Sequence, residues 1–145
     1  MFIEFTDRAS NVMSLASQEA QRFHHEFIGT EHILLGLFKA EPGKAVAILE
    51  HHNIDISKLC QEIEMLVKAE DGSDKVAAAK LPQTPMAKKV IECAMEECQV
   101  LNNSKMGTEH ILLGLLRVTD GIAAQVLTNL GLSIDNARQE MLDSQ

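Results

Sequence analysis

Two threonines and two glutamates are the residues of this chain whose types and positions suit the binding of a charged ligand. Thr6 and Thr84 stand at predicted helix starts, and Glu31 and Glu109 follow the starts of two further helices. A helix start presents unsatisfied N–H groups and a partial positive charge, so it attracts phosphate or carboxylate groups. A neighbouring carboxylate can hold a cation. Together these groups suit a ligand group that carries an anion and a cation together.

The loop after the first helix decides whether these residues meet. A helix over residues 6–23 is roughly 26 Å long, and the loop over residues 23–30 reaches at most ~24 Å when extended. The loop can therefore nearly return to the start of the helix, which predicts Thr6 near Glu31. The same count predicts Thr84 near Glu109. A simpler interpretation stays open, in which each threonine only caps its helix and each glutamate only complements a helix dipole.

Histidines are the other candidates for chemistry. His32 and His110 lie near helix starts, where a bond to the backbone or to a neighbour explains them. A catalytic histidine would need a partnered nucleophile, and the candidate serines and cysteines do not recur with the histidines. The histidine pairs at 24–25 and 51–52 could ligate a metal. However, neighbouring helical residues point to different sides, so we predict no metal site.

Many of these residues recur because the chain contains one sequence twice. Residues 29–37 and 107–115 both read GTEHILLGL, and flanking positions match at the same offset without a gap. Register of this kind marks a duplicated structural unit. We therefore divide one domain, 1–145, into repeat one at 1–67, a linker at 68–82 and repeat two at 83–145.

The fold predicted from this duplication is all-α, a single compact domain with pseudo-two-fold symmetry and about eight helices. Apolar residues recur at steps of three and four, as on one face of a helix, and no segment has a strand pattern. The predicted helices are 6–23, 30–40, 43–52 and 55–68 in repeat one, and 84–101, 108–118, 120–130 and 133–143 in repeat two.

Local signals refine this picture. Thr30 and Thr108 follow a glycine and are expected to open the second helix of each repeat as caps. Gly36 and Gly114 lie inside those helices, where a close approach of two helices would explain a missing side chain. We expect the two repeats to meet through these glycine-bearing helices. The repeated glutamates at 19 and 97 are expected on solvated helix faces.

Composition excludes several classes of protein. The formal charge of −8 argues against binding to nucleic acid or to an anionic membrane surface. The chain has no apolar run of ~20 residues and no secretory signal. Three cysteines that the repeat does not pair indicate reduced thiols. These features predict a cytoplasmic protein. No nucleotide-binding or hydrolase motif is present, so no catalytic residue is predicted.

The repeated nonapeptide resembles the amino-terminal double repeat of Clp unfoldases, with ClpC-type proteins the nearest in pattern. Further matching segments are TDRA at 6–9, LPQTP at 81–85 and GIAAQVLTNLGL at 121–132. The resemblance implies an all-α recognition domain that precedes two AAA+ ATPase rings. Such a domain receives client proteins and adaptor proteins, and it passes clients to the ring and its Clp peptidase. The resemblance implies no cofactor for this chain, because ATP and Mg²⁺ belong to the absent AAA+ modules.

The chain also resembles the ClpC-type domains that bind phosphorylated arginine on client proteins. Carried onto this sequence, the resemblance implies two ligand-binding sites, formed by Thr6 with Glu31 and by Thr84 with Glu109. The glutamate would hold the guanidinium, and the threonine with its helix start would hold the phosphate. Because Asp7 repels phosphate and its counterpart Pro85 does not, we expect the second site to bind more strongly.

One position departs from the family pattern, since Met86 stands where members often have a basic residue. Two other functions stay open. One is a purely structural module for oligomerisation or adaptor docking. The other is a small metal-binding protein that uses His32, His110 or the histidine pairs.

Overall fold

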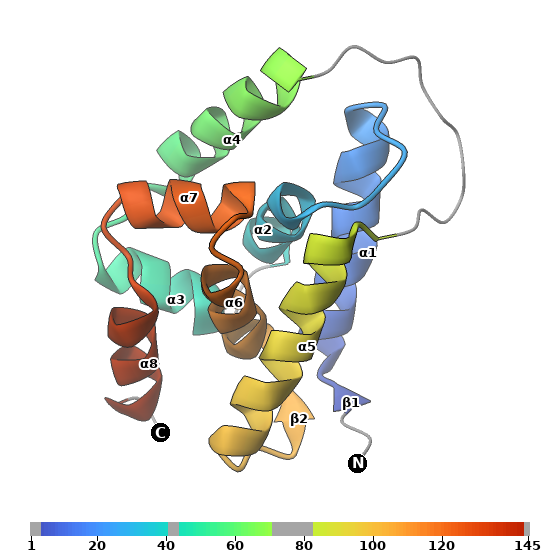
Figure 1. Cartoon of the computed structure of the whole chain (residues 1–145). Helices are drawn as coiled ribbons and strands as arrows, with labels where there is room; N and C mark the ends of the chain where they lie inside the picture. Colours follow the sequence, from blue (N-terminus) through green and yellow to red (C-terminus); the bar gives the residue numbers. More distant parts are fainter. Residues whose placement is uncertain (1–3, 41–43, 71–82, 144–145) are drawn as a thin grey trace.

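The computed structural model describes residues 4–40, 44–70 and 83–143, and Figure 1 shows them as one compact helical domain. All eight predicted helices are present, and each begins and ends within a few residues of its predicted bounds. Repeat one contains α1 (Asp7–Arg22), α2 (Thr30–Lys39), α3 (Lys44–His51) and α4 (Ile56–Glu70). Repeat two contains α5 (Pro85–Val100), α6 (Thr108–Arg117), α7 (Ile122–Asn129) and α8 (Ile134–Asp143). The first three residues of the predicted linker are helical, and 71–82 lie outside the described residues.

The repeated nonapeptide forms the two most buried helices, α2 and α6. Their aliphatic side chains are almost wholly inaccessible, and the two helices contact each other at the centre of the domain (Figure 1). The largest of these side chains are Ile33, Leu34, Leu35 and Leu37 in α2 and Ile111, Leu112, Leu113 and Leu115 in α6. A helix that is apolar on every side must be covered on every side, and the remaining helices provide that cover.

The glycines inside these helices allow close packing, as expected, but against a different partner. A Cβ atom on Gly36 would lie 2.6 Å from the Val12 carbonyl oxygen of α1. A Cβ atom on Gly114 would likewise collide with the Val90 carbonyl oxygen of α5 and approach the Ala94 nitrogen to 3.2 Å. Each glycine therefore allows the second helix of a repeat to pack closely against the first helix of the same repeat. The α2–α6 contact between repeats does not depend on it.

Thr6 and Thr84 cap α1 and α5, as predicted. The hydroxyl oxygen of each accepts the backbone N–H of the third residue on, Ala9 or Ala87, at 3.1 Å. Pro85 occupies the first turn of α5, where its missing N–H removes no helical hydrogen bond.

The prediction that the chain has no strands was wrong in one detail. Two short parallel strands, β1 (Glu4–Phe5) and β2 (Lys105–Met106), pair across the repeats. Thr6 extends this pairing by donating its N–H to the Met106 carbonyl at 2.9 Å. Two residues are too few to leave an alternating pattern in the sequence. Their effect is nevertheless large, because they fix the start of repeat one against repeat two.

Thr30 and Thr108 do not cap their own helices, contrary to the expectation from sequence. The N-cap residues are Gly29 and Gly107. The Thr30 hydroxyl instead accepts the N–H of Ala123, near the start of α7, at 3.3 Å. The Thr108 hydroxyl accepts the N–H of Ala45, near the start of α3, at 3.3 Å. Each repeat thus supplies a capping side chain to a helix of the other.

The repeated glutamates are also placed differently from the prediction, since Glu19 and Glu97 are buried. Burial by itself would raise the pKa of Glu19, but hydrogen bonds from Arg22 and Lys39 outweigh it and lower that pKa. Hydrogen bonds from Arg138 and Arg117 lower the pKa of Glu97 against the effect of burial. These carboxylates therefore act as charged anchors between helices.

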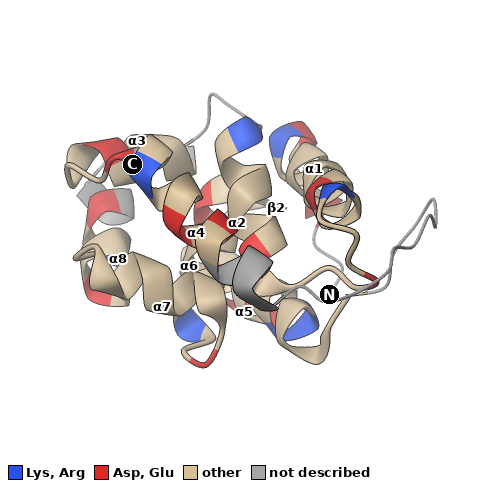
Figure 2. Cartoon of the chain, turned by 90° about the horizontal axis from the view of Figure 1, so that it is seen from above, with Lys and Arg blue, Asp and Glu red and all other residues tan. Residues whose placement is uncertain are grey.

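Basic residues are spread along the described helices. In Figure 2, Lys and Arg are scattered singly among acidic residues over the described helices. Among those helices, none alone has the length and apolarity needed to cross a bilayer. Helices α6 and α7 meet that test only when taken together, with a bend of 94° at the break between them.

Replacement of Gly114 by alanine should destabilise the domain by about 1–3 kcal/mol, because the added methyl group meets backbone atoms of α5 that cannot rotate away. Urea unfolding followed by circular dichroism measures the loss. Gln99→Ala, at an exposed position of α5, is the control and should stay within about 0.5 kcal/mol of the parent. Equal stability of Gly114→Ala and the parent would contradict the packing argument.

Thr30→Val should cost about 1–2 kcal/mol, because it keeps the shape of the side chain and leaves the buried Ala123 N–H without its acceptor. The same urea measurement tests this. Thr128→Val, an exposed threonine of α7, is the matched control. If both variants unfold at the same denaturant concentration, the cap between repeats contributes nothing.

Candidate functional site

The candidate site is an open cavity of about 660 Å³ at the junction of the two repeats. One wall is the start of α1, and the opposite wall is the segment from the end of α5 to the start of α6. The lining residues are Thr6, Asp7 and Arg8 from repeat one and Asn103, Ser104, Lys105, Gly107, Thr108, Glu109 and His110 from repeat two. The cavity therefore belongs to neither repeat alone.

The structure places Thr6 with Glu109, so the predicted pairing of Thr6 with Glu31 was wrong. After α1, the ring nitrogens of His25 and His32 lie 2.9 Å apart. This contact keeps the start of α2 beside the end of α1, and Thr6 lies at the opposite end of a 16-residue helix, roughly 24 Å away. The loop does not return to the helix start.

Thr84 also lies near the other repeat and not near Glu109 of its own. Thr84 donates its N–H to the Ile28 carbonyl at 2.9 Å, and the preceding residue forms an isolated bridge with Ile28. Ile28 lies three positions before Glu31. The pseudo-two-fold arrangement thus brings the start of α5 to the loop that leads into α2. Thr6 and Glu109 therefore form one group, and the repeat symmetry assigns Thr84 and Glu31 to the other.

Each glutamate folds back over the start of its own helix. A Cβ atom on Gly29 would lie 2.6 Å from Oε1 of Glu31, and one on Gly107 would collide with Oε1 of Glu109. Glycine at the N-cap therefore leaves room for the carboxylate. The Thr6 hydroxyl accepts a hydrogen bond from Ala9, and it still carries a proton that can be donated to an anion.

The two groups differ in the side chains beside them. Arg8 and Lys105 line the cavity around Thr6 and Glu109. Their counterparts at the repeat offset are Met86 and Phe27, which are 44% and 50% exposed. One group thus has two cations, and the other has two exposed apolar side chains. The comparison of Asp7 with Pro85 alone misses this difference, because Lys105 is distant from Thr6 in the sequence.

His32 and His110 have a structural role, as the simpler interpretation predicted. Nδ1 of each accepts the N–H of the N-cap glycine, at 2.8 Å for His32 and 2.9 Å for His110. Nε2 then carries the proton, and it faces Nδ1 of His25 in repeat one and Oδ1 of Asn103 in repeat two. Burial lowers the pKa of His32 to about 4. The neutral ring therefore serves as a hydrogen-bonded cap.

The three cysteines are free thiols, as expected. Burial raises the pKa of each of them. A raised pKa reduces the thiolate fraction and makes these side chains poor nucleophiles.

The comparisons with known proteins agree with this architecture. The family model described as the Clp repeat (R) N-terminal domain matches residues 4–130 and again residues 84–144. The ATP-dependent Clp protease ATP-binding subunit ClpC of Staphylococcus aureus (strain USA300) is 46% identical over 98% of this chain. The chain spans only 17% of the length of that relative.

Solved structures show the same fold. The N-terminal domain of the caseinolytic protease associated chaperone ClpD from Arabidopsis thaliana superposes with a TM-score of 0.73 and 28% identity, over 97% of this chain and 94% of that one. A ClpV N-domain in complex with a VipB peptide has a TM-score of 0.73 and 13% identity, over 95% of this chain and 84% of that one.

The low pKa of His32 predicts that the domain loses stability as the pH falls below about 6.5. The unfolded chain binds a proton at His32 below pH 6.5, whereas the folded chain binds it only near pH 4. The contribution of neutral His32 to the free energy of unfolding is therefore fully present well above pH 6.5. The free energy of unfolding should fall by about 2–3 kcal/mol between there and pH 4.5. His32→Asn should be less stable overall but should lose less on acidification, as measured by urea unfolding at several pH values.

The exposed neighbour provides the control for that experiment. His24→Asn copies Asn102 of repeat two, and both positions have positive φ, 62° and 61°. This variant should keep the pH dependence of the parent. An unchanged pH dependence in His32→Asn would show that another group causes the acid sensitivity.

Proposed function

The chain belongs to the Clp repeat (R) N-terminal domain family, and from that membership we propose that it is the recognition domain of a ClpC-like ATP-dependent protein unfoldase. In this proposal the domain is not itself an enzyme. It captures client proteins and adaptor proteins, and an AAA+ ring with a Clp peptidase acts on the clients. The single observation that carries the proposal is the cavity in which Thr6 and Glu109 meet.

Two comparisons support a recognition role. The matched relative is named as an ATP-binding subunit of a protease, and the chain corresponds to its repeat domain and not to its ATPase modules. A domain of the same fold, the ClpV N-domain, has been solved with a bound peptide. We extend that mode of use to this chain, which would present its cavity to segments of client or adaptor proteins.

The chemistry of the cavity favours a phosphorylated arginine as the recognised group. Glu109 can accept charge-assisted hydrogen bonds from a guanidinium. The phosphate would be held by the Thr6 hydroxyl, and the cations Arg8 and Lys105 line the same cavity. A phosphorylated arginine carries both charges on one side chain, whereas phosphoserine lacks the cation and unmodified arginine lacks the anion.

We further propose that the two sites are unequal, with the Thr6–Glu109 site the stronger. Met86 and Phe27 supply no charge at the Thr84–Glu31 site, so a phosphate there depends on the helix start and Thr84 alone. Asp7 opposes phosphate at the first site, but it is outnumbered by Arg8 and Lys105. This order is the reverse of the one expected from Asp7 and Pro85 in the sequence.

Calorimetric titration with free phosphoarginine, phosphoserine and arginine tests the ligand and the order of the sites. Selective uptake of phosphoarginine is expected. Glu109→Gln should weaken the dominant site by about 10–100-fold, because a charge-assisted hydrogen bond contributes about 1.5–3 kcal/mol. Thr6→Ala should likewise cost more affinity than Thr84→Ala.

The second repeat offers a matched exchange of side chains. Arg8→Met copies Met86 and should weaken the first site, whereas Met86→Arg should strengthen the second. A larger loss for Thr84→Ala than for Thr6→Ala would refute the proposed order. No heat from any of the three ligands would refute phosphoarginine recognition and leave adaptor docking as the function of the domain.

A further inference from the structure

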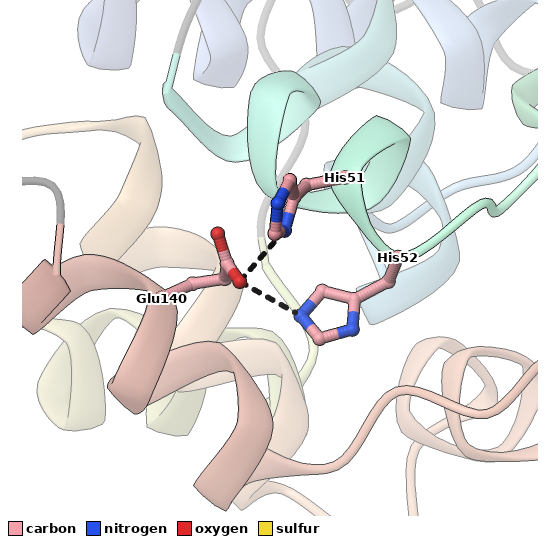
Figure 3. A group of neighbouring side chains, drawn as sticks. All are labelled: His51, His52 and Glu140. Atoms are coloured by element: carbon pink, nitrogen blue, oxygen red, sulfur yellow. Dashed lines mark ion pairs between the residues drawn. The ribbon is translucent and has the colours of Figure 1, made fainter.

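Three potential metal ligands converge on the side of the domain formed by α3 and α8. His51 is the last residue of α3, His52 follows it, and Glu140 lies on α8 (Figure 3). Nδ1 of His51 lies 2.8 Å from Oε1 of Glu140, and Nε2 of His52 lies 3.6 Å from the same oxygen. All three donor atoms lie within 4.8 Å of one another.

This convergence differs from the expectation that neighbouring histidines point to different sides of a helix. The two rings are nearly perpendicular, at 89°, with their centroids 5.9 Å apart. His51 offers its near nitrogen, Nδ1, and His52 offers its far nitrogen, Nε2, so that both reach one carboxylate from different directions (Figure 3). The side-chain reach of histidine thus compensates for the divergence of the two Cα–Cβ bonds.

The His52 nitrogen is a group that the protein leaves unsatisfied. Nε2 is shielded from solvent and has no hydrogen-bond partner among the described residues. Its 3.6 Å separation from Glu140 is too long for a hydrogen bond. A buried polar atom without a partner is costly, and a metal ion between these groups would use its lone pair.

We propose that His51, His52 and Glu140 form a binding site for a divalent transition-metal ion, with zinc as the ion that fits best. Ligands at 2.0–2.2 Å from tetrahedral zinc are about 3.3–3.6 Å apart. The 3.6 Å separation lies at the upper end of that range, and the 2.8 Å separation between His51 and Glu140 would have to widen to admit the ion. Two imidazoles and one carboxylate are a known zinc ligand set that leaves a fourth position open. His51 is 70% exposed, so water and the ion can reach that position.

The ion would join the two repeats. His51 and His52 come from repeat one and Glu140 from repeat two, and α3 and α8 pack together (Figure 1). The pseudo-symmetric positions hold Asn129, Leu130 and Glu62, so the carboxylate is present twice but the histidine pair only once. The described part of the chain therefore has one such site, with ligands from both repeats, and it is separate from the Thr6–Glu109 cavity.

Zinc titration of the chelator-treated protein, in a phosphine reductant that keeps the cysteines reduced, tests the proposal. Calorimetry should give one Zn²⁺ per chain. Zinc should also raise the midpoint of thermal unfolding, because the ion binds the folded state. The double variant His51→Asn/His52→Leu copies repeat two and should lose at least about 10–100-fold in zinc affinity.

Two further variants make the result decisive. Glu140→Gln keeps the shape and a hydrogen-bond acceptor, so its zinc affinity should fall similarly while its unfolding without zinc stays close to that of the parent. His24→Asn/His25→Asn removes the other histidine pair by copying Asn102 and Asn103, and it should bind zinc like the parent. No uptake by the parent, uptake that survives Glu140→Gln, or uptake lost only in the His24/His25 variant would each overturn the proposal.

Discussion

The exchange of contacts between the two repeats is the constraint on which this structure depends. Nearly all side chains of α2 and α6 are buried, so neither helix can stand with its apolar residues in water. Each helix also presents a threonine, Thr30 or Thr108, that caps a helix of the opposite repeat. The capping hydroxyls are buried with the N–H groups they satisfy, which makes their loss more costly than that of an exposed cap. Neither repeat is complete without the other.

This exchange also explains where the candidate ligand site lies. The strands β1 and β2 fix the start of repeat one beside the segment that leads into α6, and Thr6 is therefore brought to Glu109. A site built across two repeats has a property that a site within one repeat would lack. Thr6 and Glu109 come from different halves, so their spacing depends on the packing of the whole domain.

Many of the residues that pack inside each repeat are the same in the two copies, whereas many residues around them differ. The histidines that accept the N–H of the N-cap glycines, the buried glutamates and the packing glycines are the same in both halves, because each is fixed by buried neighbours. Several less buried positions differ. The Nε2 atom of His32 faces His25 in repeat one, whereas that of His110 faces Asn103 in repeat two. Equivalent positions of the two copies can thus carry different side chains, such as Arg8 and Lys105 in the cavity and the exposed Met86 and Phe27 at their counterparts.

The sequence by itself determined the number, order and bounds of the helices, because period and caps are local properties that reach only a few residues along the chain. It also determined the family, through the repeated nonapeptide, and it identified Thr6, Thr84 and the two glutamates as a set. Only the tertiary structure decided which threonine lies near which glutamate, since that pairing depends on contacts between residues about 50 to 100 positions apart. The same holds for the burial of Glu19 and for the convergence of the histidine pair on Glu140. These features arise from the packing of helices that are distant in the sequence, within one repeat for Glu19 and between the repeats for the histidine pair. No local pattern in the sequence records that packing.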